Sequence, residues 1–269
     1  MVVGWSLGNE IHEIIKAKEI EDILAKPEAS PIKKALIGKA IEEHVEDLGK
    51  LCSAWNVKAD SKEALYDRSL KAPASDVEEL RRFYTRWYYY NIHRMVKRID
   101  PNHLYFGFWI VPGWWENEED WRLAAPHCDV IGYDLYSFDH NTPLLTRLAK
   151  ESGKPIFCGE FSFPPYYDGT RGFGVYPVFS QHDADAGENY ARWLSQAAKN
   201  PYCVGAMWFH HRDQALTGRG PGKGPELVLG EHYAFGVVDV GDRPKWDLVE
   251  RMRKANLSAA RTRLNAREP

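Results

Sequence analysis

Two glutamates at the ends of apolar runs suggest paired carboxylate chemistry. Glu10 follows the run Val2–Leu7 and comes directly after Asn9, and Glu160 lies inside the run KPIFCGEFS at residues 154–162. Two carboxyl groups facing one cleft can break a glycosidic bond: one protonates the departing oxygen, while the other, ionised, attacks the anomeric carbon or directs water to it. A lone glutamate at a strand end is commonly a cap or an ion-pair partner. Two such positions favour a catalytic pair.

The elements that would position these residues alternate between strand and helix. Five apolar runs are predicted as buried parallel strands, at residues 2–10, 103–109, 129–136, 154–162 and 204–213. Helical patterns follow at residues 75–100, 142–153, 185–200 and 245–264, and residues 11–74 are predicted to be a mostly helical insertion. The helix at 75–100 is expected to begin with a capping box of Ser75 and Glu78. This order predicts an α/β fold with a parallel sheet covered by helices.

Polar residues gather at the C-terminal ends of the predicted strands. In a parallel barrel these ends surround one open face. They are Asn9, Glu10, Asp134, Tyr136, Glu160, Trp208, His210, His211, Arg212 and Asp213. An open doubly wound sheet would place residues in the same way, but it normally carries a phosphate-binding glycine turn after its first strand. The sequence has no such turn. A barrel is therefore the favoured prediction.

Composition narrows the classes of function. The chain has 269 residues, of which 44% are hydrophobic and 27% charged, so one domain with a sizeable core is expected. The net charge of -3 gives no overall attraction for nucleic acid or anionic lipid. Ten tryptophans suit stacking on sugar rings as well as core packing. The four cysteines lack metal-ligand spacing and are expected to be buried thiols. Neither a metal nor a cofactor is predicted.

The two glutamate motifs resemble those of a known group of enzymes. GWSLGNE and, far downstream, KPIFCGEF are similar to the retaining glycoside hydrolases of clan A, whose eight-stranded barrels carry an Asn-Glu pair on strand four and a nucleophilic Glu on strand seven. DPNHLYFGFW, CDVIGYDLYSFD and HYAFGVVDVGDRPKWDLV look most like the beta-agarases of glycoside hydrolase family fifty. The resemblance covers essentially the whole chain, best from 99 to 250.

The resemblance implies roles for the central residues. Glu10 would be the acid/base and Glu160 the nucleophile. Asn9 would hydrogen-bond the sugar 2-hydroxyl, an interaction that strengthens in the transition state. Tyr136 would lie beside Glu160 and hold its orientation.

The resemblance implies further residues that line the cleft. For each of them, a structural role in the core or at the rim is the alternative to sugar binding. Asp134 is expected to face the cleft, and Trp208 to form a platform under the sugar. Weaker candidates for sugar contacts or support are His210, Arg212 and Asp213. Trp109, Trp114 and Trp115 are candidates for outer subsites.

The resemblance also implies an incomplete barrel. If Glu10 ends strand four, the chain contains strands four to eight of a (β/α)8 TIM-barrel type fold, as one partial domain over residues 1–269. Five strands cannot close an eight-stranded barrel, and an open parallel edge would expose apolar groups. Completion by another polypeptide or by self-association is expected, so a homo-oligomer or a partner chain is predicted. A remnant that has lost catalysis is the alternative.

Two classes of function remain open at this point. The first is a retaining glycoside hydrolase that cleaves beta-galactosidic bonds in an agarose-like polysaccharide, with a beta-galactosidase of the same clan as the nearest rival. The second is a non-catalytic protein that binds carbohydrate or assists assembly. A polysaccharide or oligosaccharide is the expected ligand, without nucleic acid or membrane. Relatives suggest a secreted or periplasmic location, although no signal sequence is visible here.

Overall fold

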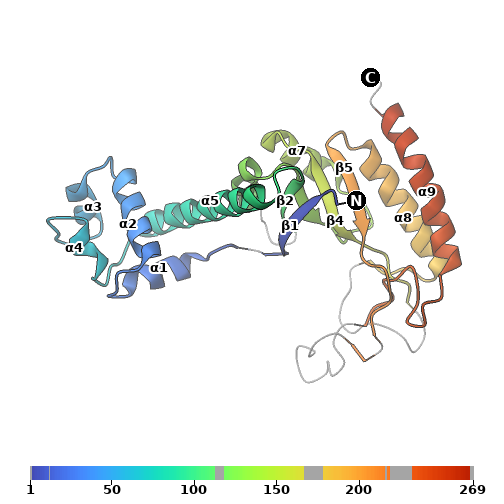
Figure 1. Cartoon of the computed structure of the whole chain (residues 1–269), viewed down its shortest axis with the longest axis horizontal. Helices are drawn as coiled ribbons and strands as arrows, with labels where there is room; N and C mark the ends of the chain where they lie inside the picture. The colour runs from blue at the N-terminus through green and yellow to red at the C-terminus, as the bar shows by residue number, and fades with distance from the viewer. Residues whose placement is uncertain are drawn as a thin grey trace. The chain divides into compact units, whose positions relative to one another are not determined.

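The computed structural model describes residues 2–11, 13–112, 118–166, 178–215, 217–218 and 232–266. The chain forms two compact units. One combines Met1–Ile11 with His103–Pro269, and the other is His12–Asn102 (Figure 1). The first unit holds the strands and the second is helical, so each has its own core.

The sheet unit contains, in its described residues, five strands that lie side by side in chain order. They are β1 (Gly4–Asn9), β2 (Leu104–Trp109), β3 (Ile131–Asp134), β4 (Ile156–Phe161) and β5 (Cys203–Trp208). β1 pairs with β2, and β3 with β4 and β4 with β5, all in parallel. A parallel bridge between Ile110 and Tyr133 joins the two groups. Each of the five predicted apolar runs therefore contains a strand, and the parallel α/β prediction is confirmed.

Helices cover one side of this sheet. They are α6 (Glu118–Ala124), the short η1 (Ala125–His127), α7 (Thr142–Ser152), α8 (Asp183–Lys199) and α9 (Trp246–Asn265). α8 and α9 lie side by side next to β5 in Figure 1. α7 ends at Gly153, whose φ of 64° is in the left-handed region that glycine adopts without strain.

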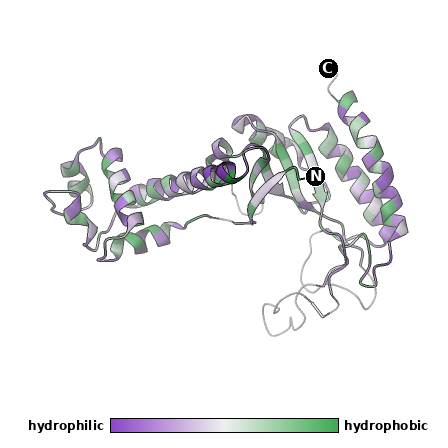
Figure 2. Cartoon of the chain, in the orientation of Figure 1, coloured by the Kyte–Doolittle hydropathy of each residue, from purple (hydrophilic) through white to green (hydrophobic). Residues whose placement is uncertain are grey.

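A stacked aromatic pair fixes α8 on the sheet. The ring of Phe161, on β4, lies 3.9 Å from the indole of Trp193 on α8 at an interplanar angle of 10°. Both side chains are at most 1% exposed. Burial of side chains this large contributes roughly 1.5–3 kcal/mol each. In Figure 2 the hydrophobic colour is strong on β4, whereas β1 is pale and the helices show mixed hydropathy.

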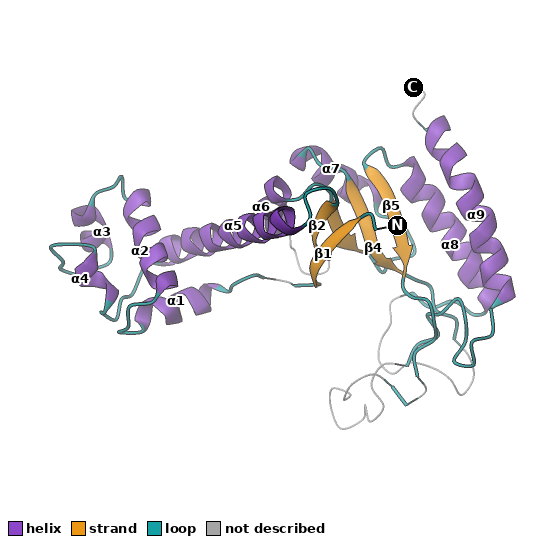
Figure 3. Cartoon of the chain, in the orientation of Figure 1, coloured by secondary structure: helices purple, strands orange, loops and turns teal. Residues whose placement is uncertain are grey.

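The helical unit contains α1 (Ala17–Ala25), α2 (Pro31–Glu43), α3 (Leu48–Ala54), α4 (Glu63–Tyr66) and α5 (Ala74–Ile99) (Figure 3). The expected insertion at residues 11–74 thus forms one unit together with the long helix that follows it. Its core is built from aliphatic side chains that include Ile20, Leu24, Leu36, Ile37, Leu51 and Leu80.

The predicted capping box of this long helix is wrong. Pro73 occupies the N-cap position, so Ser75 lies inside the first turn and its hydroxyl donates to Asp76 Oδ1 at 3.1 Å. Asp76 also accepts a hydrogen bond from Trp55 Nε1 at 2.7 Å and lies 2.8 Å from His44 Nε2. Pro73 has an extended backbone with ψ of 152°, so the helix begins directly after it, at Ala74.

The two outer strands of the sheet leave apolar side chains in solvent. On and before β1, Val3 is 59% exposed and Trp5 42%, and on β5 Val204 is 58% exposed and Met207 46%. Parallel sheets are normally covered on both faces. None of the described helices has the length and apolarity needed to cross a membrane.

Candidate active site

The end of β1 turns sharply to present Glu10. A Cβ at Gly8 would lie 2.0 Å from the ring of Phe108, and the φ of Gly8 is 116°, so only glycine fits there. Asn9 is in register with Trp109 of β2. Glu10 has a left-handed φ of 49°, and its backbone N–H donates to the Trp109 carbonyl at 3.1 Å. The motif thus holds Glu10 at the carboxyl end of the sheet.

Three carboxyl groups converge at this end of the strands. Asp134 of β3 and Glu160 of β4 are direct partners in the parallel register. One carboxylate oxygen from each of Glu10, Asp134 and Glu160 lies within 4.8 Å of the other two. The structure therefore brings together Glu10 and Glu160, the two glutamates predicted from sequence to form a pair. Asp134 is the third carboxyl group beside them. We call these three residues the carboxyl triad.

Tyr136 orients one member of the carboxyl triad. Its hydroxyl donates to Glu160 Oε2 at 2.6 Å, a short charge-assisted hydrogen bond. The chain reaches Tyr136 directly after β3, where Leu135 N–H donates to the Glu160 carbonyl at 2.9 Å. Tyr136 thus lies where the resemblance implies.

A packed tryptophan forms the floor beneath the carboxyl triad. A Cβ at Gly132 or at Gly159 would lie 2.4 Å from the indole of Trp109, so both glycines allow the ring to lie directly on the strands. Trp109 also stacks on Phe157 with ring centroids 6.3 Å apart. This position makes Trp109 a packing residue, not an outer subsite. The other two candidates for outer subsites, Trp114 and Trp115, lie outside the described residues.

Asp134 is enclosed by this packing. Its side chain is fully buried, and neither carboxyl oxygen has a hydrogen-bond partner among the described residues. Burial, reinforced by the negative charges of Glu160 and Glu10, raises the pKa of Asp134 to about 9. Asp134 is therefore protonated at neutral pH. A direct contact with substrate, as predicted for Asp134, does not agree with complete burial.

Trp208 lies on the helix side of the sheet, and the platform expected there is not found. Its ring packs against Phe161, Phe163 and Tyr190 of α8, and its Nε1 donates to the Phe235 carbonyl at 2.7 Å. Strand residues alternate between the two faces, and Trp208 shares the face of Phe161.

Phe209, the residue after Trp208, is an aromatic side chain beside the site that was not predicted from sequence. Phe209 contacts Tyr136 edge-on with ring centroids 6.5 Å apart, and its N–H donates to the Phe161 carbonyl at 3.0 Å. His210 follows with its ring 4.6 Å from that of Phe209, so it remains a candidate for sugar contact. The signal available in sequence is the alternation itself, since Phe209 is one position after Trp208.

Arg212 and Asp213 serve the fold in this structure. Arg212 is exposed and pairs with Asp242 at 3.3 Å. Asp213 Oδ1 accepts from Lys245 Nζ at 2.6 Å and from the Gly236 N–H at 2.8 Å. The two side chains of the Asp213–Lys245 pair are only 10% and 5% exposed. Asp213 thus belongs to a buried ion pair that anchors the segment before α9, in keeping with the supporting role given as its alternative, while a sugar contact of the exposed Arg212 stays a prediction.

The buried pair gives a stability prediction. Lys245→Met is expected to lower the free energy of unfolding by about 3–5 kcal/mol, because it leaves the Asp213 charge buried without its cation. Replacing both residues together by leucine and methionine should cost less. The matched control is Arg253→Met, which breaks the exposed pair with Glu250 and should cost under about 1 kcal/mol.

Urea unfolding followed by circular dichroism measures these differences. If Lys245→Met costs no more than the Arg253→Met control, while Asp213→Ala raises KM for a saccharide substrate, Asp213 belongs to the substrate site after all.

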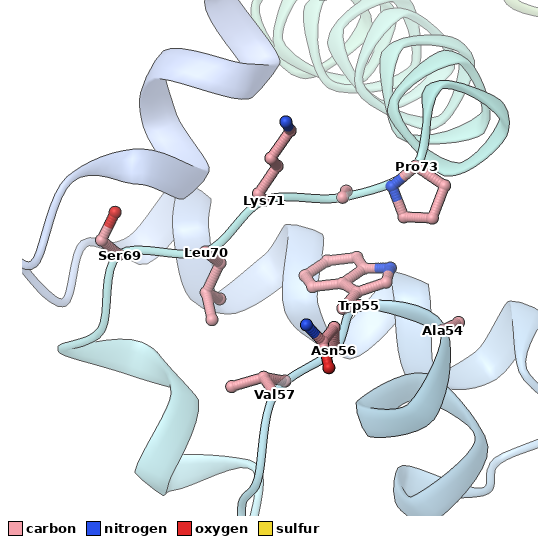
Figure 4. A pocket seen from close by; sticks show the side chains of 9 residues that line it. Ala54, Trp55, Asn56, Val57, Ser69, Leu70, Lys71 and Pro73 are labelled. Carbon is pink, nitrogen blue, oxygen red and sulfur yellow. The ribbon is translucent and has the colours of Figure 1, made fainter.

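A separate pocket lies within the helical unit. It has a volume of about 420 Å³ and is lined by residues 54–57 and 69–73 (Figure 4). Trp55 lies in its wall but is only 5% exposed, and Lys71 is its one charged lining side chain. Because the lining contains no carboxylate, this pocket does not offer the paired acid and base of the carboxyl triad.

The carboxyl triad is also the group of described residues whose spacing suits a metal ion. Three carboxylate oxygens would suit a hard cation such as Ca²⁺. One oxygen of Glu160 already accepts the Tyr136 hydroxyl, so a cation here would share that carboxylate with the tyrosine.

Comparison with known proteins agrees with a carbohydrate-active site. No family model matches the chain. Beta-agarase B of Vibrio sp. strain JT0107 is 32% identical over 235 residues, which span 84% of this chain and 24% of that protein. A solved exo-beta-agarase is 27% identical with a TM-score of 0.76, over 97% of this chain and 36% of that one. A second solved agarase is 25% identical with a TM-score of 0.75, over 97% of this chain and 37% of that one. The chain spans about a quarter of the length of the curated relative.

Proposed function

We propose that this chain, which belongs with the beta-agarases of glycoside hydrolase family fifty, carries the catalytic pair of a retaining enzyme that cleaves beta-galactosidic bonds in agarose. The observation that supports this most is the approach of Glu10 and Glu160, whose nearest carboxylate oxygens are within 4.8 Å. Retaining pairs are typically about 5–5.5 Å apart, whereas inverting pairs are about 6.5–9.5 Å apart to leave room for water.

The geometry supports a two-step reaction. In the first step Glu160 attacks the anomeric carbon, and Glu10 gives its proton to the departing glycosidic oxygen as that bond breaks. In the second step Glu10 takes a proton from water, which attacks the same carbon and releases Glu160. Because each step inverts the anomeric carbon, the two steps together retain its configuration. Tyr136 holds the nucleophile in place through its 2.6 Å hydrogen bond.

Asn9 and the residues after β5 would bind the sugar. Asn9 precedes Glu10 at the exposed end of β1, where its amide would contact the 2-hydroxyl. Phe209, next to Tyr136, offers an aromatic surface to the apolar face of a sugar ring, and His210 a polar group beside it. In this proposal Phe209 takes the platform role expected of Trp208.

The exposed outer strands support a further part of the proposal. The five parallel strands would be strands four to eight of a (β/α)8 barrel, and additional polypeptide would cover β1 and β5. The support is the exposure of Trp5 on β1, of Val3 just before it, and of Val204 and Met207 on β5. The same exposure favours a second candidate function, a carbohydrate-binding protein that keeps the cleft without turnover. A beta-galactosidase of the same clan would use the same carboxylates on smaller substrates.

One sample tests these alternatives. Release of reducing ends from agarose and from an aryl beta-galactoside is measured on protein whose mass is determined by light scattering in the same buffer. We expect agarose cleavage by a species larger than one chain, with the first-formed product in the beta configuration. Binding of agar oligosaccharides without cleavage by any species would favour the binding protein, and cleavage of the aryl galactoside alone would favour the galactosidase.

A further inference from the structure

We propose that Asp134 is a positioning residue which keeps its proton throughout the reaction and donates it as a hydrogen bond to whichever glutamate is ionised. This inference rests on the proposed function, because it concerns how the catalytic pair shares one negative charge. Nothing in the roles of Glu10 and Glu160 requires a third carboxyl group, yet the fold buries one beside them.

Asp134 is buried directly beside both glutamates. Its side chain is fully buried, and its carboxyl lies within 4.8 Å of the carboxyls of Glu10 and Glu160. A Cβ added to Gly159 would lie 2.8 Å from Asp134 Oδ1, so the backbone of β4 closes one side of the group. Neither oxygen makes a hydrogen bond of good geometry to a described residue, although the Glu160 backbone N–H acts on the carboxyl and lowers its pKa slightly. The carboxyls of Glu10 and Glu160 are the acceptors that lie next to an Asp134 O–H.

The charged groups around Asp134 favour its protonated form. The groups that face it are Glu160 and Cys158 from β4, Glu10 after β1 and, through its bond to Glu160, Tyr136 after β3. Among the described residues, both charges that act on Asp134 are negative. Three like charges this close cannot all be ionised. With Glu10 protonated as the acid, the remaining negative charge is best held by Glu160, because Asp134 is fully buried beside it and its own charge would be both desolvated and repelled. The pKa of about 9 that burial gives Asp134 agrees.

The charge of the carboxyl triad then stays constant through the reaction. In the free enzyme Glu160 is ionised, and Glu10 and Asp134 are protonated. When the bond from Glu160 to the anomeric carbon forms and the glycosidic bond breaks, the Glu10 proton leaves with the departing oxygen, so the negative charge moves to Glu10. Attack by water returns a proton to Glu10 and frees Glu160 as a carboxylate. One negative charge is present at each stage, and the Asp134 O–H can follow it from one glutamate to the other.

Two substitutions of similar size test the role of the donated hydrogen bond. Asp134→Leu removes the donor and is expected to lower kcat by about 10²-fold, the effect typical of losing one donor to a reacting charge. Asp134→Asn supplies a neutral N–H donor and is expected to rescue most of that loss. The two limbs of the pH–rate profile should stay within about 0.3 pH units of wild type in the asparagine variant, because no charge has been removed.

An ionised Asp134 would give a different pH–rate profile. If Asp134 is ionised in the working enzyme, asparagine removes a negative neighbour, and the pKa values of both glutamates fall. Both limbs of the profile would then move to lower pH by about one unit or more, and this shift would overturn the proposal.

A measurement without substrate separates this inference from the proposed function. Infrared difference spectra of Glu10→Gln and of Glu10→Gln with Asp134→Asn are compared at pH 7. We expect a protonated-carboxyl carbonyl band in the first that is missing from the second and that disappears as the pH is raised past about 9. Absence of the band from Glu10→Gln at pH 7 would show that Asp134 holds a charge instead and would overturn the proposal. These spectra remain decisive even if agarose is never cleaved.

Discussion

Glu160→Ala is expected to lower kcat on agarose by about 10⁴-fold or more, because the variant lacks the group that forms the covalent intermediate. The structure places this carboxylate on β4 with one oxygen held by Tyr136 at 2.6 Å, so the loss cannot be made up by a neighbouring side chain in the same position. Binding should survive, since Asn9, Phe209 and His210 are unchanged. Turnover on agarose and on an activated aryl beta-galactoside, together with calorimetric binding of an agar oligosaccharide, measures both effects.

The control for Glu160→Ala is Glu188→Ala. Glu188 lies on α8, where its side chain is 71% exposed and makes only a loose 3.9 Å pair with Arg251. This control should retain wild-type turnover and an unchanged thermal midpoint. If Glu160→Ala retains more than a tenth of wild-type turnover while the control behaves as expected, Glu160 is not the nucleophile.

Glu10→Ala should give the second large effect, and one that depends on the leaving group. A galactosyl unit leaving from agarose needs a proton, so turnover of agarose should fall by about 10²–10⁴-fold. An activated aryl group leaves without one, so formation of the glycosyl-enzyme should continue. Added azide should then speed turnover, because the small anion enters the space left by the carboxylate and attacks the intermediate without a general base.

The product identifies the roles of the two glutamates. With Glu10→Ala, the glycosyl azide should have the beta configuration, since it arises from a second inversion at the same carbon. Glu160→Ala should give no beta azide. Equal losses for both variants on every leaving group, with no azide product, would show that the roles are assigned wrongly.

The fold was largely predictable because buried parallel strands have a simple signature. Each of the five apolar runs contains a strand, but the burial expected of a parallel strand holds only for β2, β3 and β4, because β1 and β5 leave apolar side chains exposed. The stop of α7 at Gly153 was predictable for a similar local reason. The start of α5 was not, because Pro73 and Ser75 both suit a helix start and only the tertiary structure shows which of them begins it.

The outer site residues depended on information that local sequence does not contain. The pairing of Asp213 with Lys245 joins positions 32 residues apart in sequence, so the charge at Asp213 could equally have served a sugar. The face of Trp208 could not be counted along β5 from sequence, because the register between β4 and β5 shifts twice, between Ile156 and Phe157 and again between Cys158 and Phe161. Two members of the carboxyl triad were predictable, since Glu10 and Glu160 stand in recognisable motifs. The burial of Asp134 was not, because it follows from tertiary packing around β3 and β4 that local sequence does not show.

Trapping of the covalent intermediate tests the central assignment most directly. The species that cleaves agarose is incubated with an activated 2-deoxy-2-fluoro-galactoside, whose fluorine slows release of the intermediate, and the digested protein is mapped by mass spectrometry. We predict a single label, bonded to Glu160, with Glu10 unmodified and with no labelling of Glu160→Ala. A label on any other residue, or a first-formed product in the alpha configuration with no label at all, would contradict the assignment of Glu160 as the nucleophile of a retaining pair.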